Sequence, residues 1–292
     1  MRANGMLQTD PTKSLEVSPN QEPYRIVDQP PGLIRLPNRH NPVLNAVLAR
    51  VNADAELHAL WHAQNVTAAD RLGMSDHGPV HMQIVANIAL RLLRFFVERN
   101  LTPDLVVNYA LPYGLGDPDA EVVVVLAALM HDLGMSIHRA DHENYSLFVA
   151  QPLIDRILDG LYAPGARTIM RSEILHAIIS HRAGGKPLTI EAGIVRLADA
   201  LDMTAGRSRI AFEAGKVNIH SVSAAAIEKV EIMQGESKPV RVHIVMNNSA
   251  GIYQVDELMR EKLRGSGIEQ YIEIEAITEG TTDKKLVKLL RV

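Results

Sequence analysis

Histidine and aspartate side chains that stand beside apolar helical segments are the residues best suited to chemistry in this chain. Twelve histidines are present, and seven of them fall within residues 77–181. Neutral imidazole nitrogen and carboxylate oxygen form a ligand mixture that Mn²⁺, Fe²⁺, Mg²⁺ and Zn²⁺ accept. Six of these residues stand beside apolar helical stripes: His81, His131, Asp132, His142, His181 and Asp199. Their clustering predicts a metal site.

His131 and Asp132 directly follow the longest apolar run of the chain, Val122–Met130. Adjacent helical side chains point about 100° apart, yet both can reach one ion at the end of a helix. Burying the Asp132 charge beside this run would be costly without a cation. Taken alone, the pair also fits two simpler roles, in which Asp132 interacts with the C-terminus of the helix or forms an ion pair with Arg139.

Four of these six residues lie in three distinctive local patterns. These are Leu129-Met130-His131-Asp132-Leu133-Gly134, Leu197-Ala198-Asp199-Ala200-Leu201-Asp202, and His81 followed by Val85. In this order, they resemble the apolar-apolar-His-Asp-apolar-Gly signature, the final Ala-Asp motif and the opening helix of the HD-domain metal-dependent phosphohydrolase superfamily. The resemblance covers about residues 40–206. It implies an all-helical core of five or more helices with the metal at its centre.

The resemblance also implies a role for each candidate ligand. Four residues match the ligands of the family's first metal: His81, His131, Asp132 and Asp199. Two more match the extra histidines of its two-metal members: His142 and His181. Asp132 would bridge both ions, and His131 and Asp132 would form the catalytic centre. Two such ions clamp a phosphate, lower the pKa of a water and stabilise in-line displacement, so no protein nucleophile is needed.

Two further histidines precede candidate ligands in the chain. His77 precedes His81 by four residues, but Gly78-Pro79 interrupts any helix between them. We expect His77 to contact the substrate, or otherwise to be an exposed turn histidine. His176 lies about 140° around a helix from His181, and we expect it on the helix surface.

Other polar residues near the motifs are candidates for supporting roles. His138, four residues before His142, is expected to line the pocket. Asp202 is expected to orient a metal ligand or to hold an arginine. Asp76 and Glu143 are both candidates for the general acid, and the sequence does not choose between them.

A phosphate substrate requires positive charge at the site. Five cationic residues flank the motifs: Arg139, Arg182, Lys186, Arg196 and Arg207. Arginine suits bidentate phosphate contacts, and lysine provides a point charge. We predict substrate contacts for Arg139, Arg182 and Lys186, although each could instead be a solvated surface charge.

Helical periodicity is expected to position these residues. Asn41 caps a helix that begins at Pro42, and the segment 121–131 is a buried helix. Helices are predicted from residue 42, at about 55–66, from 79 to about 100, at 121–131, at about 141–160, at 166–182 and at 189–204, with a loop around Leu111–Pro118.

The pattern changes at both ends of this helical segment. Residues 1–41 contain many prolines and few apolar residues, which predicts an extended or disordered arm, or alternatively an ordered coil. After residue 206, alternation in Val230–Ile232, Val240–Met246 and 272–275, with a helical stretch at Gln254–Leu263, predicts a β-β-α-β segment. The fold class is mainly α: a helical metal-binding domain at 42–206 and a small α+β domain at 207–292, for dimerisation or as a lid.

Composition limits the remaining classes. The net charge of −4 argues against a stable nucleic-acid partner. Cysteine is absent, which excludes disulfides, thiolate metal sites and cysteine nucleophiles. No apolar run approaches the length of a membrane span, and no signal peptide pattern is present. We expect a cytoplasmic homo-oligomer without a membrane partner.

The function that these observations favour is hydrolysis of a phosphomonoester or phosphodiester, with a nucleotide as one candidate, using one or two divalent ions (Fe, Mn, Mg or Zn). Two alternatives stay open. One is a di-iron oxygenase, because some two-metal HD-domain proteins resemble this chain in their ligand set. The other is a non-catalytic module that senses a nucleotide and signals through the C-terminal domain.

Overall fold

The computed structural model describes residues 33–38, 40–182, 184–203, 223–279 and 289–291. The predicted arm lies outside these residues up to position 32, and Ile34 and Leu36 at its end are buried. The predicted boundary between residues 206 and 207 lies outside them too, as does Arg207. All of the described residues belong to one compact unit.

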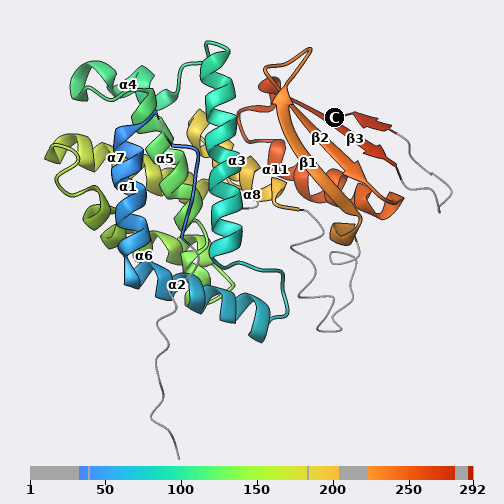
Figure 1. The fold of residues 1–292 in the computed structure, drawn as a ribbon, viewed down its shortest axis with the longest axis horizontal. Coiled ribbons are helices and arrows are strands. Elements are labelled where there is room, and N and C mark those ends of the chain that lie inside the picture. Colours follow the sequence, from blue (N-terminus) through green and yellow to red (C-terminus); the bar gives the residue numbers. More distant parts are fainter. Residues whose placement is uncertain (1–32, 39, 183, 204–222, 280–288, 292) are drawn as a thin grey trace, which may run out of the picture. The chain divides into compact units, whose positions relative to one another are not determined.

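The first part of the chain is helical (Figure 1). Its helices are α1 (Pro42–Ala53), α2 (Ala55–Asn65), α3 (Pro79–Glu98), α4 (Asp104–Tyr113), α5 (Asp117–Met130), α6 (His142–Leu158), α7 (Pro164–Ser180) and α8 (Ile190–Leu201). A π-helical turn, Val66–Arg71, follows α2, and a 3₁₀ turn, Leu133–Ser136, follows α5. This architecture confirms the mainly α fold class.

Helix α5 forms the centre of the core. It is buried from Val122 to Met130, and α3, α7 and α8 all pack against it. Asn41 caps α1 as predicted, since its side chain accepts a hydrogen bond from the Leu44 N–H at 2.9 Å. The Asn41 amide also donates to the Pro118 carbonyl, which ties the start of α1 to the start of α5.

Helix α3 meets the length and hydropathy criteria for crossing a membrane. Half of that stretch is buried within the protein, where α3 packs against α5 and α8. These contacts are those of a core helix, and the core is where α3 places His81.

Helix α4 corrects one prediction. Residues 111–113 belong to this helix rather than to a loop, and Gly114 ends it with a left-handed φ of 68°. The helix buries only Leu105, so it carries no apolar stripe that periodicity could detect. Pro112 lies inside this helix, although the residue before a proline is biased away from the helical conformation.

The C-terminal part is a four-stranded sheet with a helical connection. Its elements are β1 (Ile227–Gln234), β2 (Val240–Met246), a π-helical turn (Gln254–Met259), α11 (Arg260–Leu263), β3 (Ile272–Thr278) and β4 (Leu289–Arg291). The strand order is β1-β2-β3-β4. β2 and β3 are parallel and the other pairs antiparallel, so the helical connection supplies the crossover that parallel strands require. The predicted β-β-α-β segment is confirmed, and β4 is an addition.

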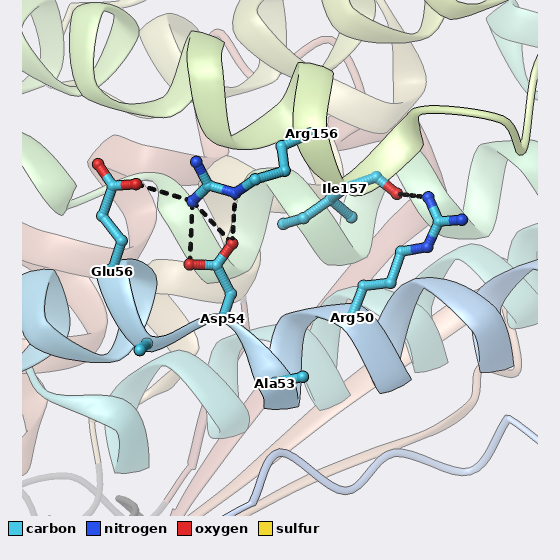
Figure 2. A pocket seen from close by; sticks show the side chains of 7 residues that line it. Arg50, Ala53, Asp54, Glu56, Arg156 and Ile157 are labelled. Carbon is cyan, nitrogen blue, oxygen red and sulfur yellow. Dashed lines mark hydrogen bonds and ion pairs between the residues drawn. The ribbon is translucent and has the colours of Figure 1, made fainter.

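An open hollow of about 450 Å³ lies where α1 and α2 meet α6 (Figure 2). Arg156 binds both carboxylate oxygens of Asp54, at 3.0 and 2.8 Å through Nη2. Arg50 donates to the Ile157 carbonyl at 2.7 Å. These contacts hold the α1–α2 corner against α6, and we assign this hollow a structural role.

Candidate metal centre

The six candidate ligands lie at the ends of five helices. His81 is in the first turn of α3, His131 and Asp132 follow α5, His142 begins α6, His181 follows α7, and Asp199 is in the last turn of α8. Because α5 is buried along most of its length, its C-terminal end delivers two of these side chains directly into the interior.

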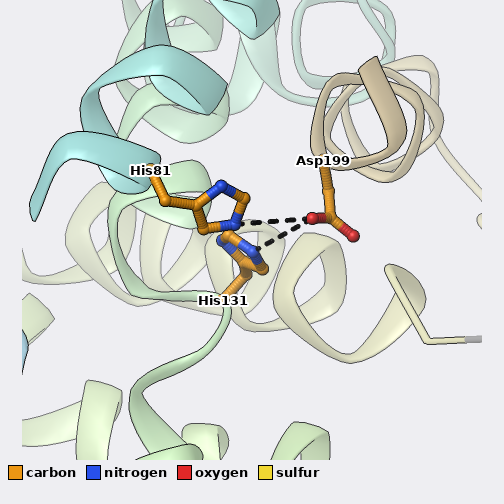
Figure 3. Close-up of side chains that lie close together, drawn as sticks. All are labelled: His81, His131 and Asp199. Carbon is orange, nitrogen blue, oxygen red and sulfur yellow. Dashed lines mark ion pairs between the residues drawn. The ribbon is translucent and has the colours of Figure 1, made fainter. Parts of the chain in front are cut away.

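His81 and His131 turn their Nε2 atoms toward the same oxygen of Asp199 (Figure 3). Both distances from Nε2 to Asp199 Oδ1 are 3.6 Å. Two ligand atoms of one tetrahedral cation, each bonded at about 2.1 Å, lie about 3.4 Å apart. The spacing of these three atoms therefore suits an ion between them.

Asp132 faces different histidines with its two oxygens. Its Oδ1 lies 3.0 Å from His142 Nε2 and 3.6 Å from His181 Nε2. Its Oδ2 lies 3.4 Å from His131 Nε2 and 3.8 Å from His81 Nε2. This carboxylate is thus placed between two groups of histidines, as a bridging ligand would be.

The other ring nitrogen of each clustered histidine contacts an oxygen acceptor. The Nδ1 contacts are His77 to the Ser75 carbonyl (2.7 Å), His81 to Asp202 Oδ2 (2.6 Å), His131 to the Ala128 carbonyl (2.8 Å), His142 to the Arg139 carbonyl (3.0 Å) and His181 to the Ile178 carbonyl (2.6 Å). At His77, His81, His131 and His181, an acceptor at Nδ1 favours the tautomer with its proton there, which leaves the Nε2 lone pair for a metal. His142 Nδ1 also has the Arg139 guanidinium, which can only donate, at 2.7 Å.

The two carboxylates of the centre, Asp132 and Asp199, favour a positive charge beside them. Burial disfavours a proton on His131, but Asp132 and Asp199 outweigh it and raise the pKa of His131 to about 10. Burial acts to raise the pKa of Asp199, yet Lys262 and His131 hold that pKa well below its usual range. For His181, burial lowers the pKa.

The residues present fit a divalent cation. His131 Nε2 is buried and, among the described residues, has no hydrogen-bond partner. Three groups each place three ligand atoms within 4.8 Å of one another: His81–His131–Asp199, His131–Asp132–His181 and His142–Glu143–His181. Nitrogen and oxygen donors in these groups suit Mn²⁺, Fe²⁺, Mg²⁺ or Zn²⁺.

His77 and Asp202 both reach the centre. His77 is 7% exposed, and its Nε2 lies 3.9 Å from Asp132 Oδ2, so the exposed-turn alternative is wrong. Gly78 and Pro79 do interrupt the helix, because α3 begins at Pro79. Asp202 accepts a hydrogen bond from His81 Nδ1, the arrangement expected of a residue that orients a ligand.

Several other candidates lie at the surface. The structure does not bring His138 to the centre: its side chain is exposed, and its Nδ1 accepts from the Ala140 N–H. Arg182 and Lys186 are exposed and border a hollow of about 300 Å³ beside His176. His176 is half-buried and accepts a hydrogen bond from the Leu188 N–H.

Three charged candidates lie next to the ligands. Arg139 is exposed, with its Nη1 2.7 Å from His142 Nδ1. Glu143 Oε2 is 3.2 Å from the same nitrogen. Asp76 Oδ2 accepts from the His81 N–H at 3.3 Å. The geometry leaves both Asp76 and Glu143 as candidates for the general acid.

Sequence reasoning missed Lys262 and assigned no specific role to Arg196, one of the five cations that flank the motifs. Lys262 in α11 places its Nζ 3.3 Å from Asp199 Oδ2. The two residues are 63 positions apart, and no motif spacing connects them. Arg196 is 2% exposed and donates to backbone carbonyls, including that of Gly185 at 2.8 Å, so it is a buried structural residue and not a free cation.

Comparison with known proteins agrees with this geometry. The sequence model of the HD domain matches residues 80–204, a range that contains all six candidate ligands. The chain is also 40% identical, over 215 residues, to a protein of Methanocaldococcus jannaschii named "Uncharacterized protein MJ1020". The match covers 74% of this chain and 82% of that relative. The histidines and aspartates that converge between the helix ends lie within the matched range, and the chain belongs to the HD-domain family.

Proposed function

We propose that the protein is a metal-dependent phosphohydrolase that cleaves a phosphomonoester or a phosphodiester, with nucleotides among the candidate substrates. The observation that carries this proposal is the convergence of histidine Nε2 atoms on two carboxylates, the buried Asp132 and the partly buried Asp199. Membership of the HD-domain family supports a hydrolase of this kind.

Each part of the centre has a distinct task in this proposal. Bound divalent cations would polarise a phosphoryl oxygen and lower the pKa of a water. His81, His131 and Asp199 would hold one ion, His142 and His181 a second, and Asp132 would contact both. The chain excludes bulk water from the ligands, since His131 is 0% exposed and Asp132 is 4% exposed.

Arg139 is the best placed of the predicted substrate-binding cations. Its guanidinium lies against His142 and is exposed, so it could contact the phosphate of a substrate that approaches from solvent. His77, whose Nε2 faces Asp132, would contact the same group. Arg182 and Lys186 border a different hollow. They could contact a part of the substrate that lies away from the phosphate.

The test is hydrolysis by protein loaded separately with Mn²⁺, Fe²⁺, Mg²⁺ and Zn²⁺, on a panel of phosphomonoesters, phosphodiesters and nucleotides. We expect release of phosphate or nucleoside by the native protein, and no release by Asp132→Ala. Asp155→Ala is the matched control, because Asp155 pairs with Arg171 and not with a candidate ligand, so this variant should leave turnover unchanged.

A folded, metal-loaded protein that turns over no member of the panel would contradict the proposal. Oxygen uptake with an organic substrate would then favour the di-iron oxygenase. Nucleotide binding in calorimetry without turnover would favour the sensor.

The setting of the protein is part of the same proposal. We propose that it acts in the cytoplasm on a phosphorylated small molecule or nucleotide, as a homo-oligomer, without a membrane or a stable nucleic-acid partner. The net charge of −4 supports the last point. Light scattering coupled to size exclusion tests the oligomeric state.

A further inference from the structure

The C-terminal part of the chain contributes a lysine to the metal centre. Lys262 Nζ lies 3.3 Å from Asp199 Oδ2 and also donates to the His181 carbonyl. The Lys262 side chain is 22% exposed. This residue lies outside residues 80–204, which the HD-domain family model matches.

Asp199 divides its two oxygens between different partners. Oδ1 faces the Nε2 atoms of His81 and His131, each at 3.6 Å, whereas Oδ2 faces Lys262. A donor on one carboxylate oxygen fixes the rotation of the group and leaves the other oxygen as a single ligand. Contacts of this kind orient metal ligands and tune their affinity.

The backbone of Lys262 is itself held in place by a buried arginine on α8. Arg196 Nε donates to the Lys262 carbonyl at 2.8 Å, and its Nη1 donates to the carbonyls of Arg182 and Gly185 at 2.7 and 2.8 Å. Arg196 and Asp199 are three residues apart and so lie on neighbouring turns of one helix face. Helix α8 therefore fixes α11 with Arg196, and Lys262 reaches back to Asp199.

A glycine allows the chain after α11 to approach α8 closely. A Cβ atom on Gly193 would lie 2.4 Å from the Ser266 carbonyl oxygen and 3.1 Å from Ile268 Cγ2. The Ser266 oxygen belongs to the backbone, so it cannot move aside as the end of a flexible side chain could. Any larger residue at 193 must displace this segment, which follows Lys262 closely in the chain.

We propose that Lys262 is a positioning residue of the metal centre. It holds Oδ2 of Asp199 and thereby presents Oδ1 to the cation, so that metal binding depends on the docking of α11 onto α8. The inference rests on the proposed function only in requiring a cation at this site. It makes the C-terminal part a determinant of metal affinity, in addition to any role in dimerisation or as a lid.

The test measures metal binding by the full chain without substrate. Lys262→Met removes the ammonium and keeps an apolar stem, and Lys262→Arg keeps the positive charge. We expect Lys262→Met to lower the Mn²⁺ affinity about 10- to 100-fold in calorimetry and to change the visible spectrum of bound Co²⁺. Lys262→Arg should restore most of the affinity. Should the Met variant not fold, Lys262→Gln, which also removes the positive charge, should lower the Mn²⁺ affinity in the same way.

Two further variants separate positioning from general stability. Lys238→Met is the matched control, because Lys238 also donates to backbone carbonyls in the C-terminal part, those of Glu269 and Ile272. It should bind Mn²⁺ as the native chain does. Gly193→Ala should weaken Mn²⁺ binding by displacing the segment after α11, although the added methyl group would meet Ser266 and Ile268 rather than a ligand.

Native affinity and an unchanged Co²⁺ spectrum in Lys262→Met would overturn the inference. A raised KM with unchanged metal affinity would also overturn it, because Lys262 would then contact the substrate. If the native chain binds metal and Lys262→Met does not, but neither hydrolyses any phosphoester, the proposed function fails and the role of Lys262 stands.

Discussion

At the scale of single residues, hydrogen bonds at Nδ1 decide how the clustered histidines can act. Most of these acceptors are backbone carbonyls, such as Ala128 for His131 and Ile178 for His181. His81 differs, because its acceptor is the carboxylate of Asp202. A carboxylate makes the imidazole more basic and a stronger metal ligand than a carbonyl does.

The Asp202 contact leads to the first prediction. Asp202→Ala removes the acceptor of His81 Nδ1, so the ring loses both its orientation and its tautomer preference. We expect the Mn²⁺ affinity to fall about 10- to 100-fold, measured by calorimetry on the metal-depleted protein. Asp155→Ala is the control, since Asp155 pairs with Arg171 on the neighbouring helix. Equal affinities of the two variants would contradict the prediction.

Glu191 is a buried carboxylic acid whose raised pKa makes the stability of the fold depend on pH. It is 2% exposed, and its Oε1 accepts a hydrogen bond from the Leu105 N–H at 2.9 Å. Burial raises its pKa from 4.5 to about 7, although the Leu105 N–H acts to lower it, and the negative charges of Asp104 and Glu173 raise it further. The folded protein therefore retains a proton at pH values where the unfolded chain has lost it.

This proton makes the stability depend on pH in a defined direction. Between pH 4.5 and about 7 the folded state binds more protons at Glu191, so the free energy of unfolding falls as pH rises. Its share is about 3 kcal/mol at most. Glu191→Gln should match the native chain at pH 4.5 and be more stable at pH 7.5, as measured by urea unfolding. Parallel pH profiles of the two proteins would show that Glu191 does not titrate in this way.

At the scale of elements, the turn after α5 and the start of α6 lie backbone against backbone. A Cβ on Gly134 would lie 2.0 Å from the His142 carbonyl oxygen. Ser146 in α6 accepts from the Gly134 N–H at 2.8 Å and donates to the His131 carbonyl at 2.7 Å. The glycine of the His-Asp-apolar-Gly signature thus sets the distance between His131 and His142.

Gly134→Ala tests this close approach. The added methyl group must push α6 away and carry His142 with it, and overpacking of this kind costs about 1–3 kcal/mol. We expect a lower urea midpoint and loss of one bound ion per chain by elemental analysis. Gly116→Ala is the control, because a Cβ there meets only Pro118 Cδ at 3.6 Å. Native stability and metal content in Gly134→Ala would show that α6 can shift freely.

At the scale of the whole molecule, the metal centre joins five helices that are distant in the chain. From His81 to Asp199 the ligands span most of the helical part. The unfolded chain cannot assemble such a site, so a cation bound there would stabilise the folded state by mass action.

Metal addition should therefore raise the melting temperature. At a free Mn²⁺ concentration 100 times the Kd, the stabilisation is about 2.7 kcal/mol, which is about 4 °C for a chain of this size. A chelator should reverse the shift. Asp132→Asn, which removes the charge between the two groups of histidines, should show a much smaller shift. Identical melting curves with and without each candidate ion would contradict a metal centre.

Local patterns in the sequence were enough to predict most of the helices, the alternating strands and the six candidate ligands. Apolar periodicity identifies α3, because burial imposes it on one side of every turn. The continuous apolar run Val122–Met130 identifies α5, and the pair His131-Asp132 directly follows it. Helix α4 was not predicted, because it buries only Leu105 and so shows no apolar periodicity. Strand β4 is three residues long, too short to show alternation.

Tertiary structure alone decided which charged residues reach the centre. His77 and Asp202 lie within contact of the ligands, while His138 is exposed, although all three stand close to a motif in sequence. Lys262 and Arg196 could not be assigned from spacing, because their roles arise where α11 docks on α8. Side-chain chemistry and hydrophobic periodicity are local properties of the sequence. Which distant segments come together depends instead on how the whole core packs.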